Sequence, residues 1–169
     1  MYKRQVLEKN VADKSLQLWD IGTGSGIIAI TLKLERPRWE ITASDVSKQA
    51  LCLAQQNCDH LGAQLTLIQG NWFDTTAAVT KNHFDVIISN PPYIDKESPY
   101  LEQGDLRFEP KIALTDEKDG LAAYRVLSKE ALYYLKPQGW LCVEHGYTQQ
   151  AAIQQMFYKA GWTLSLIHI

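Results

Sequence analysis

The sequence lacks any apolar run near the roughly 18 residues that a membrane-spanning helix requires. It also lacks a strong charge of either sign, because 17 Lys and Arg oppose 19 Asp and Glu for a formal net charge of -2. No stretch concentrates lysine and arginine, although a domain that binds nucleic acid by itself typically has such a stretch. These absences argue against membrane insertion and direct nucleic-acid binding, and they favour a protein or small-molecule substrate.

Cysteine and histidine are scarce and scattered. The three cysteines, Cys52, Cys58 and Cys142, form no C-x-x-C pair, and the four histidines stand singly. Neither pattern fits a disulfide framework or a zinc site. The sequence therefore predicts no bound metal and a reducing, cytoplasmic location.

The composition is that of a globular domain, with 46% hydrophobic and 21% charged residues in a chain of 169. This length is near the usual size of one domain and suffices to bury roughly two-thirds of the surface of the unfolded chain. We expect residues 1–169 to form a single domain.

Short apolar segments alternate with segments of helical periodicity along the chain. The apolar segments are not interrupted by polar residues at every second position, which is typical of strands buried on both faces of a parallel sheet. This order predicts an α/β fold with a doubly wound, mostly parallel sheet of the Rossmann-like type. Ser47 is expected to cap a helix, and residues 91–119 to form a long polar loop. The predicted strands are residues 16–21, 40–44, 65–70, 84–89 and 141–144, the last introduced by a turn at 136–139, and the predicted helices are residues 26–35, 47–61, 120–135 and 149–160.

A glycine-rich turn follows the first predicted strand, with glycines at three alternate positions. Glycine lets backbone approach a ligand closely at the carboxyl end of a parallel sheet. Because position 27 is isoleucine, the G-x-G-x-x-G pattern of dinucleotide sites is absent. A purely structural turn is the alternative. The candidate cofactor-binding residues here are Asp20, Gly22, Thr23, Gly24, Ser25 and Gly26.

Two further residues follow the next strands. Asp45 ends the second predicted strand, where a carboxylate can accept hydrogen bonds from the ribose hydroxyls of an adenosine-containing cofactor. It could equally belong to the cap region of the next helix. Trp72 follows the third strand, where an aromatic ring can lie against adenine, with core packing as the alternative.

Asn90, Pro91, Pro92 and Tyr93 follow the fourth predicted strand and are the candidate catalytic residues. A planar amino group attacks a methyl sulfonium poorly unless its hydrogens engage acceptors, and the Asn90 side-chain oxygen and the Pro91 carbonyl can supply two. Prolines fix φ, and Tyr93 offers a ring face for a planar amide or base. An ordinary turn is the alternative. The segment predicts methylation of a planar amino group, with Asn90 also near the cofactor.

Six segments together resemble the HemK/PrmC-type methyltransferases, which modify the glutamine of the GGQ motif in peptide-chain release factors. The resemblance covers residues 18–162. Its segments are DIGTGSG at 20–26, NWF at 71–73, SNPPYI at 89–94, GDLRFEP at 104–110, DGL at 119–121 and EHGY at 144–147.

The resemblance implies a class I methyltransferase that uses S-adenosyl-methionine and acts on a release factor. It implies that the glycine turn and Asp45 bind the cofactor, that Trp72 lies at the adenine, and that residues 90–93 hold the glutamine amide. Residues 104–110 would frame the active site, with Arg107 and Glu109 bracing one another.

Two departures from the family pattern concern the ends of the chain. The family usually begins with a small helical domain and closes its sheet with a hairpin of two further strands, and neither is recognisable here. Residues 1–5 and 165–169 look like translated adapter ends rather than natural protein. We therefore expect a fragment truncated at both ends, with an exposed sheet edge that favours aggregation.

Two other functions compete with the release-factor hypothesis. A methyltransferase acting on an exocyclic amine of DNA or RNA bases uses a similar loop, but it usually adds a basic surface or a target-recognition region. A catalytically inactive fragment that only binds S-adenosyl-methionine is the second alternative. A monomer is expected in each case.

Overall fold

A computed structural model describes residues 15–74, 79–98, 104 and 110–163. Predictions for residues 1–5 and 165–169, and for Arg107 and Glu109, lie outside this part of the chain. The elements are β1 (Gln17–Ile21), α2 (Ile27–Glu35), β2 (Glu40–Asp45), α3 (Lys48–Leu61), β3 (Thr66–Gln69), β4 (Phe84–Ser89), α4 (Lys111–Leu114), α5 (Ala122–Glu130), the 3-10 helix η4 (Ala131–Tyr133), β5 (Leu135–Val143) and α6 (Gln150–Lys159).

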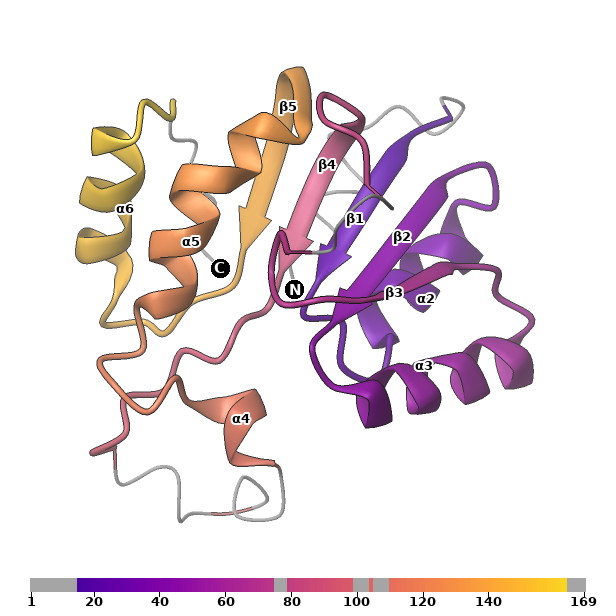
Figure 1. Cartoon of the computed structure of the whole chain (residues 1–169), viewed down its shortest axis with the longest axis horizontal. Helices are drawn as coiled ribbons and strands as arrows, with labels where there is room; N and C mark the ends of the chain where they lie inside the picture. The colour runs from indigo at the N-terminus through magenta and orange to yellow at the C-terminus, as the bar shows by residue number, and fades with distance from the viewer. Residues whose placement is uncertain (1–14, 75–78, 99–103, 105–109, 164–169) are drawn as a thin grey trace. The chain divides into compact units, whose positions relative to one another are not determined.

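The described strands form one parallel sheet in the order β3-β2-β1-β4-β5, side by side in Figure 1. The chain moves outward from β1 to β3 and then returns to place β4 on the other side of β1. Right-handed crossovers on the two sides of such a reversal wind the sheet in opposite directions. The predicted doubly wound parallel α/β fold is confirmed.

Two compact units are distinguished along the chain. The first contains the described residues up to Asn90 together with Ala131–Val143, and so holds the whole sheet with α2 and α3. The second contains the described residues of Pro91–Glu130 and those from Glu144 onward, including α4, α5 and α6.

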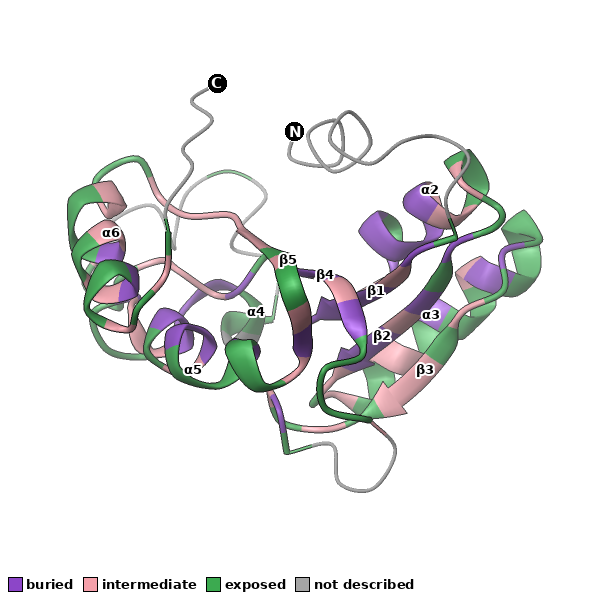
Figure 2. Cartoon of the chain, turned by 90° about the horizontal axis from the view of Figure 1, so that it is seen from above, coloured by how far each residue is buried: buried purple, intermediate pink, exposed green. Residues whose placement is uncertain are grey.

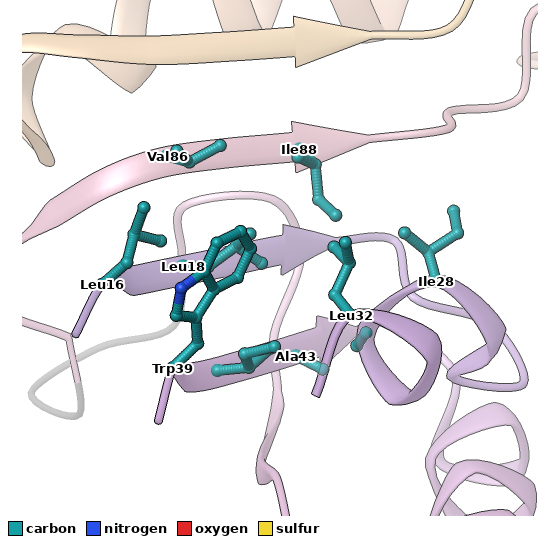
Figure 3. Packing of buried hydrophobic residues seen from close by; sticks show 10 residues of the cluster. Leu16, Leu18, Ile28, Leu32, Trp39, Ala43, Val86 and Ile88 are labelled. Atoms are coloured by element: carbon teal, nitrogen blue, oxygen red, sulfur yellow. The ribbon is translucent and has the colours of Figure 1, made fainter. Parts of the chain in front are cut away.

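The core of the first unit fills the space between the sheet and α2 (Figure 3). Leu18 of β1 and Val86 and Ile88 of β4 are fully buried, and Leu32 of α2 packs into the same cluster. Successive strand side chains point to opposite faces, so Trp19 lies on the other face, where its ring contacts the rings of three further residues. These are Phe73, Phe84 and Tyr134, with centroids 5.4, 5.1 and 5.4 Å from that of Trp19. Both faces of β1 are buried, so its sequence does not alternate between apolar and polar residues (Figure 2).

In the second unit, α5 and α6 are tied together near the described end of the chain. The Trp162 indole N–H donates to the Ser128 carbonyl of α5 at 2.8 Å, and its ring meets that of Phe157 of α6. Tyr124 of α5 is fully buried, with its hydroxyl donating to the Glu144 carbonyl at 2.7 Å.

The structure differs from the sequence prediction at β5, which begins at Leu135 rather than at residue 141. Leu135 pairs with Phe84 and Trp140 with Val86, so residues 136–139 bulge out of one continuous strand instead of preceding it. For the same reason the helix predicted over 120–135 stops at Glu130 and continues only as the short η4. The described residues of the loop predicted at 91–119 include the short helix α4.

Candidate functional site

The glycine turn between β1 and α2 has the backbone conformation that only glycine adopts easily. Gly22, Gly24 and Gly26 have φ of 74°, 58° and 78°, all in the left-handed region. A Cβ added at Gly22 or Gly24 would meet nothing within 4 Å. The glycines there leave space beside the backbone, as close approach of a ligand requires.

The turn is fastened to the carboxyl end of β2. The backbone N–H groups of Gly22 and Thr23 both donate to the Ser44 carbonyl, at 2.9 and 3.0 Å. The Thr23 hydroxyl donates to Asp20 Oδ2 at 2.7 Å, and both side chains are buried. The structure therefore places Asp20 behind the turn as its support, and the more accessible backbone belongs to Gly22, Gly24 and Ser25.

Asp45 links the glycine turn to the start of α3. Its Oδ2 accepts from the Gly24 N–H at 2.9 Å, and its Oδ1 accepts from the Ser47 N–H at 2.8 Å. Ser47 is the N-cap of α3, as predicted, with its hydroxyl accepting from Ala50 N–H at 3.2 Å. A carboxylate offers about four lone-pair sites, so these two bonds leave capacity for the hydroxyls of a ligand. Both interpretations of Asp45 are compatible with this geometry.

The sequence analysis missed Asn57 as a site residue. Its side-chain amide donates to the Ser25 carbonyl at 2.9 Å, so α3 holds the far end of the turn. Gly26 lies beside it in a tight contact between helices, because an added Cβ would lie 3.1 Å from Ile30 and 3.2 Å from Ala54. The one signal in the sequence was a polar residue at the helical spacing of Ala54 and Leu61, on the side of α3 that carries small and apolar residues.

Trp72 lies in a turn after β3, in which the Asp74 N–H donates to the Asn71 carbonyl at 2.9 Å. The neighbouring Phe73 supplies the buried ring of this segment, whereas Trp72 is only half-buried. Trp72 has a φ of 53°, and holding a bulky residue in the left-handed region costs on the order of 1–3 kcal/mol. Such conformations persist where the surrounding structure enforces them, most often at functional sites.

The candidate catalytic segment begins where β4 ends. The Ser89 hydroxyl donates to the Ile21 carbonyl at 2.8 Å and joins the carboxyl ends of β4 and β1. Asn90, which follows, is exposed and is the last residue of the first unit, whereas Pro91 is buried and opens the second. The Asn90 side-chain amide is thus presented to solvent beside a rigid, buried proline.

Tyr93 is held in the second unit by residues that the sequence analysis did not single out. Its carbonyl accepts from Gln149 Nε2 at 2.8 Å, and its hydroxyl donates to Glu144 Oε1 at 3.4 Å. Burial, and then the neighbouring Glu144 carboxylate, raise the pKa of the Tyr93 phenol. The ring therefore stays neutral at physiological pH. Glu144 lies in a segment that carried the family resemblance, but Gln149 was expected only as the start of a helix.

Metal chemistry and membrane insertion can be judged for the described part of the chain. Within it, no three His, Cys, Asp or Glu side chains gather where they could hold a metal ion. No helix there is long and apolar enough to cross a membrane.

The methyltransferase small domain family matches this chain over residues 4–102. The chain is also similar to curated proteins described as release factor glutamine methyltransferases. That of Neisseria gonorrhoeae is 46% identical over 147 residues, covering 87% of this chain and 54% of the relative, and that of Shewanella oneidensis is 41% identical over 151 residues, covering 89% and 52%. The chain thus spans about half the length of the curated relatives it matches.

Solved structures add evidence on the fold. A methyltransferase from Pyrococcus furiosus superposes with a TM-score of 0.69 at 21% identity, covering 96% of this chain and 72% of that one. A ribosomal protein L11 methylase from Lactobacillus delbrueckii subsp. bulgaricus gives a TM-score of 0.66 at 20% identity, covering 97% and 68%. With a glycine turn fastened to Asp45 at the carboxyl end of a doubly wound sheet, the chain has the class I S-adenosyl-methionine-dependent methyltransferase fold and belongs to the methyltransferase small domain family.

Proposed function

We propose that this chain is the catalytic part of an enzyme that transfers a methyl group from S-adenosyl-methionine to the side-chain nitrogen (N5) of the glutamine in the GGQ motif of a peptide-chain release factor. The observation that carries the proposal is the Asn90 to Tyr93 segment directly after β4, in a chain with 46% identity to a release factor glutamine methyltransferase.

The residues around the glycine turn suit the cofactor. The open space at Gly22 and Gly24 would let the backbone lie against S-adenosyl-methionine, and the remaining lone pairs of Asp45 would accept from its ribose hydroxyls. Trp72 would lie at the adenine. The bound cofactor supplies an electrophilic methyl group on a positively charged sulfur. Thr23, Ser25 and Gly26 shape the turn, Asp20 supports it, and Asn90 extends the site.

The residues after β4 suit a planar amide. The Asn90 side-chain oxygen and the Pro91 carbonyl would accept the two N–H bonds of the substrate glutamine, turning its nitrogen toward the methyl group. Pro92 fixes the backbone, and the Tyr93 ring offers a flat face. The nitrogen becomes acidic only after it gains the methyl group, so orientation, rather than a strong base, supports the transfer.

The alternative substrates are exocyclic amines of DNA or RNA bases. The formal net charge of -2 gives no support to a phosphate-binding surface. A catalytically inactive fragment that only binds S-adenosyl-methionine is the second alternative.

The test is methyl transfer from labelled S-adenosyl-methionine to a purified release factor, its GGQ Gln→Ala variant and duplex DNA. Label on the unmodified release factor alone is expected, and Asn90→Ala should abolish it. Label on DNA would favour the base-methylating alternative. If the chain alone is inactive, the same assay is run on a chimaera that adds the remaining half of the Neisseria gonorrhoeae relative. Cofactor binding without transfer by that chimaera would contradict the proposal.

We further propose that the protein acts as a monomer in the cytoplasm, where release factors work and where its cysteines stay reduced. Light scattering during size-exclusion chromatography at micromolar concentration should give the mass of one chain. A stable dimer would contradict this part of the proposal.

A further inference from the structure

The side-chain amide of Gln149 joins three turns of the second unit. Its Nε2 donates to the Tyr93 carbonyl at 2.8 Å and to the Gly120 carbonyl at 3.2 Å. Its Oε1 accepts from the Gly146 N–H at 3.0 Å. Both donor hydrogens of the amide have an acceptor, which fixes the orientation of its plane.

Gly120 is shaped to permit this contact. Its φ of 71° lies in the left-handed region, and an added Cβ would overlap the Tyr93 carbonyl and lie 2.7 Å from Gln149 Nε2. The Gly120 N–H is held by Asp116 Oδ1 at 2.9 Å, and a second oxygen of Asp116 accepts from Ala122 N–H at the start of α5. The turn therefore brings its backbone against the amide and cannot carry a side chain there.

The same segment holds the other end of Tyr93. Glu144, five positions before Gln149, accepts from the Tyr93 hydroxyl at 3.4 Å. The Glu144 carbonyl is itself held by the buried hydroxyl of Tyr124 at 2.7 Å. Tyr93 is thus fixed through its backbone by Gln149 and through its ring by Glu144.

We propose that Gln149 is a positioning residue for the methyl transfer, acting through Tyr93 rather than on the reacting atoms. The proposal rests on the proposed function, in which residues 90–93 hold the substrate amide. Pro91 and Pro92 have fixed φ, so anchoring the Tyr93 carbonyl leaves few rotations by which the Pro91 carbonyl can turn away from the substrate. A displacement of about 1 Å in such a site can cost about a hundredfold in rate.

The experiment compares Gln149→Glu, Gln149→Met and Gln155→Glu with the wild type. At neutral pH a carboxylate in place of the amide cannot donate to the two carbonyls, so kcat for the release factor should fall at least about tenfold, while the Kd of S-adenosyl-methionine stays unchanged. Gln155→Glu makes the same change at an exposed site on α6 and should behave like the wild type.

A pH series separates positioning from general damage. As the pH falls from about 7 toward the ordinary pKa of glutamic acid, about 4.3, the new carboxyl of Gln149→Glu gains a proton and one donor, so its kcat relative to the wild type should recover. Gln149→Met has no donor at any pH and should not recover. Three results would overturn the proposal. They are a wild-type kcat in both Gln149→Glu and Gln149→Met, a loss of cofactor affinity as large as the loss of kcat, or a recovery of kcat at low pH that is the same in both variants.

A measurement on the wild type keeps the test independent of variant folding and of the substrate. The two Gln149 Nε2 hydrogens should exchange with solvent more slowly than those of the exposed Gln155 amide in ¹⁵N NMR spectra. Rapid exchange of these hydrogens would show that the Gln149 amide does not hold the Tyr93 and Gly120 carbonyls. If the chimaera with the remaining half of the relative also methylates no release factor, the proposed function fails, but this NMR result still decides whether Gln149 holds Tyr93.

Discussion

Asp45 connects the glycine turn to α3 through a single side chain. One of its oxygens fixes Gly24 and the other fixes Ser47, so the carboxylate cannot rotate without breaking one of these contacts. A group held in this way is preorganised, because little conformational freedom is lost when a ligand binds. The affinity of the cofactor should therefore depend on both the charge and the geometry of this residue.

We expect Asp45→Asn to weaken S-adenosyl-methionine binding at least about tenfold, since hydrogen bonds to a charged group contribute about 1.5–3 kcal/mol. The amide NH2 of the variant would face a backbone N–H and lose one of the two anchoring contacts. Isothermal titration calorimetry measures the change. Asp59→Asn, at an exposed position of α3, is the matched control and should leave the affinity unaltered. Equal Kd values for Asp45→Asn and the wild type would contradict the role of Asp45.

Some site residues could be predicted from the sequence and others could not, because only some of them leave a local pattern. Gly22, Gly24 and Gly26 could be found because left-handed backbone leaves a local signature of glycine spacing. Asn57 and Gln149 act on carbonyls 32 and 56 positions away in the chain. No local pattern encodes such contacts, because they exist only once the helices have packed.

At the scale of elements, Gly26 sets how closely α2 approaches α3. Gly26→Ala should destabilise the protein by about 2–4 kcal/mol, because the left-handed strain of a non-glycine residue adds to overpacking against Ile30 and Ala54. Gly24→Ala carries similar strain but meets no neighbour within 4 Å, so it should cost only about 1–2 kcal/mol. Urea denaturation measures both. Equal losses would mean that packing against α3 does not matter.

The start of α5 contains an ion pair between two exposed side chains. Asp119 accepts from Arg125 Nη1 at 3.0 Å and pairs with Nη2 as well, and these contacts lower the pKa of Asp119 from 3.8 to about 2. A lowered pKa stabilises the folded state above the unfolded pKa, and that stability is lost as the pH falls from about 4 to about 2.

Asp119→Asn should therefore destabilise the protein at neutral pH, by less than about 1 kcal/mol because the pair is exposed and screened. The difference from the wild type should shrink as the pH falls through the window from about 4 to about 2. Chemical denaturation at several pH values checks this. A difference that grows with acidification would show the opposite linkage.

The bulge in β5 illustrates a limit of reading elements from sequence. Residues 136–139 include Pro137 and Gly139, and proline and glycine favour turns outside a strand. The pairing of Leu135 with Phe84 restores the strand on the far side of the turn, and it depends on β4 as a template. A local pattern cannot distinguish a turn before a strand from a bulge within one.

For the molecule as a whole, the alternation of apolar and helical segments was enough to predict the parallel, doubly wound sheet, because the central strands β1 and β4 are buried on both faces and their sequences do not alternate between apolar and polar residues. The division into two compact units was not predicted. The first unit includes Ala131–Val143 as well as the described residues up to Asn90, although these segments are far apart in the sequence. The pairing of β5 with β4 brings them together. Such long-range pairing follows from the finished sheet and not from any segment alone.

The sheet should open unevenly from its sides. β1 is paired on both sides and Leu18 and Trp19 are fully buried, whereas β3 has one neighbour among the described strands and no fully buried residue. Native-state hydrogen exchange should then find the amides of β3 exchanging at least about tenfold faster than those of β1, because β3 can detach without global unfolding. A small increase in urea concentration should accelerate exchange more in β1 than in β3, since the opening of β1 exposes more surface than the opening of β3. Equal rates and equal urea dependence in the two strands would instead mean that the sheet opens only as one cooperative unit.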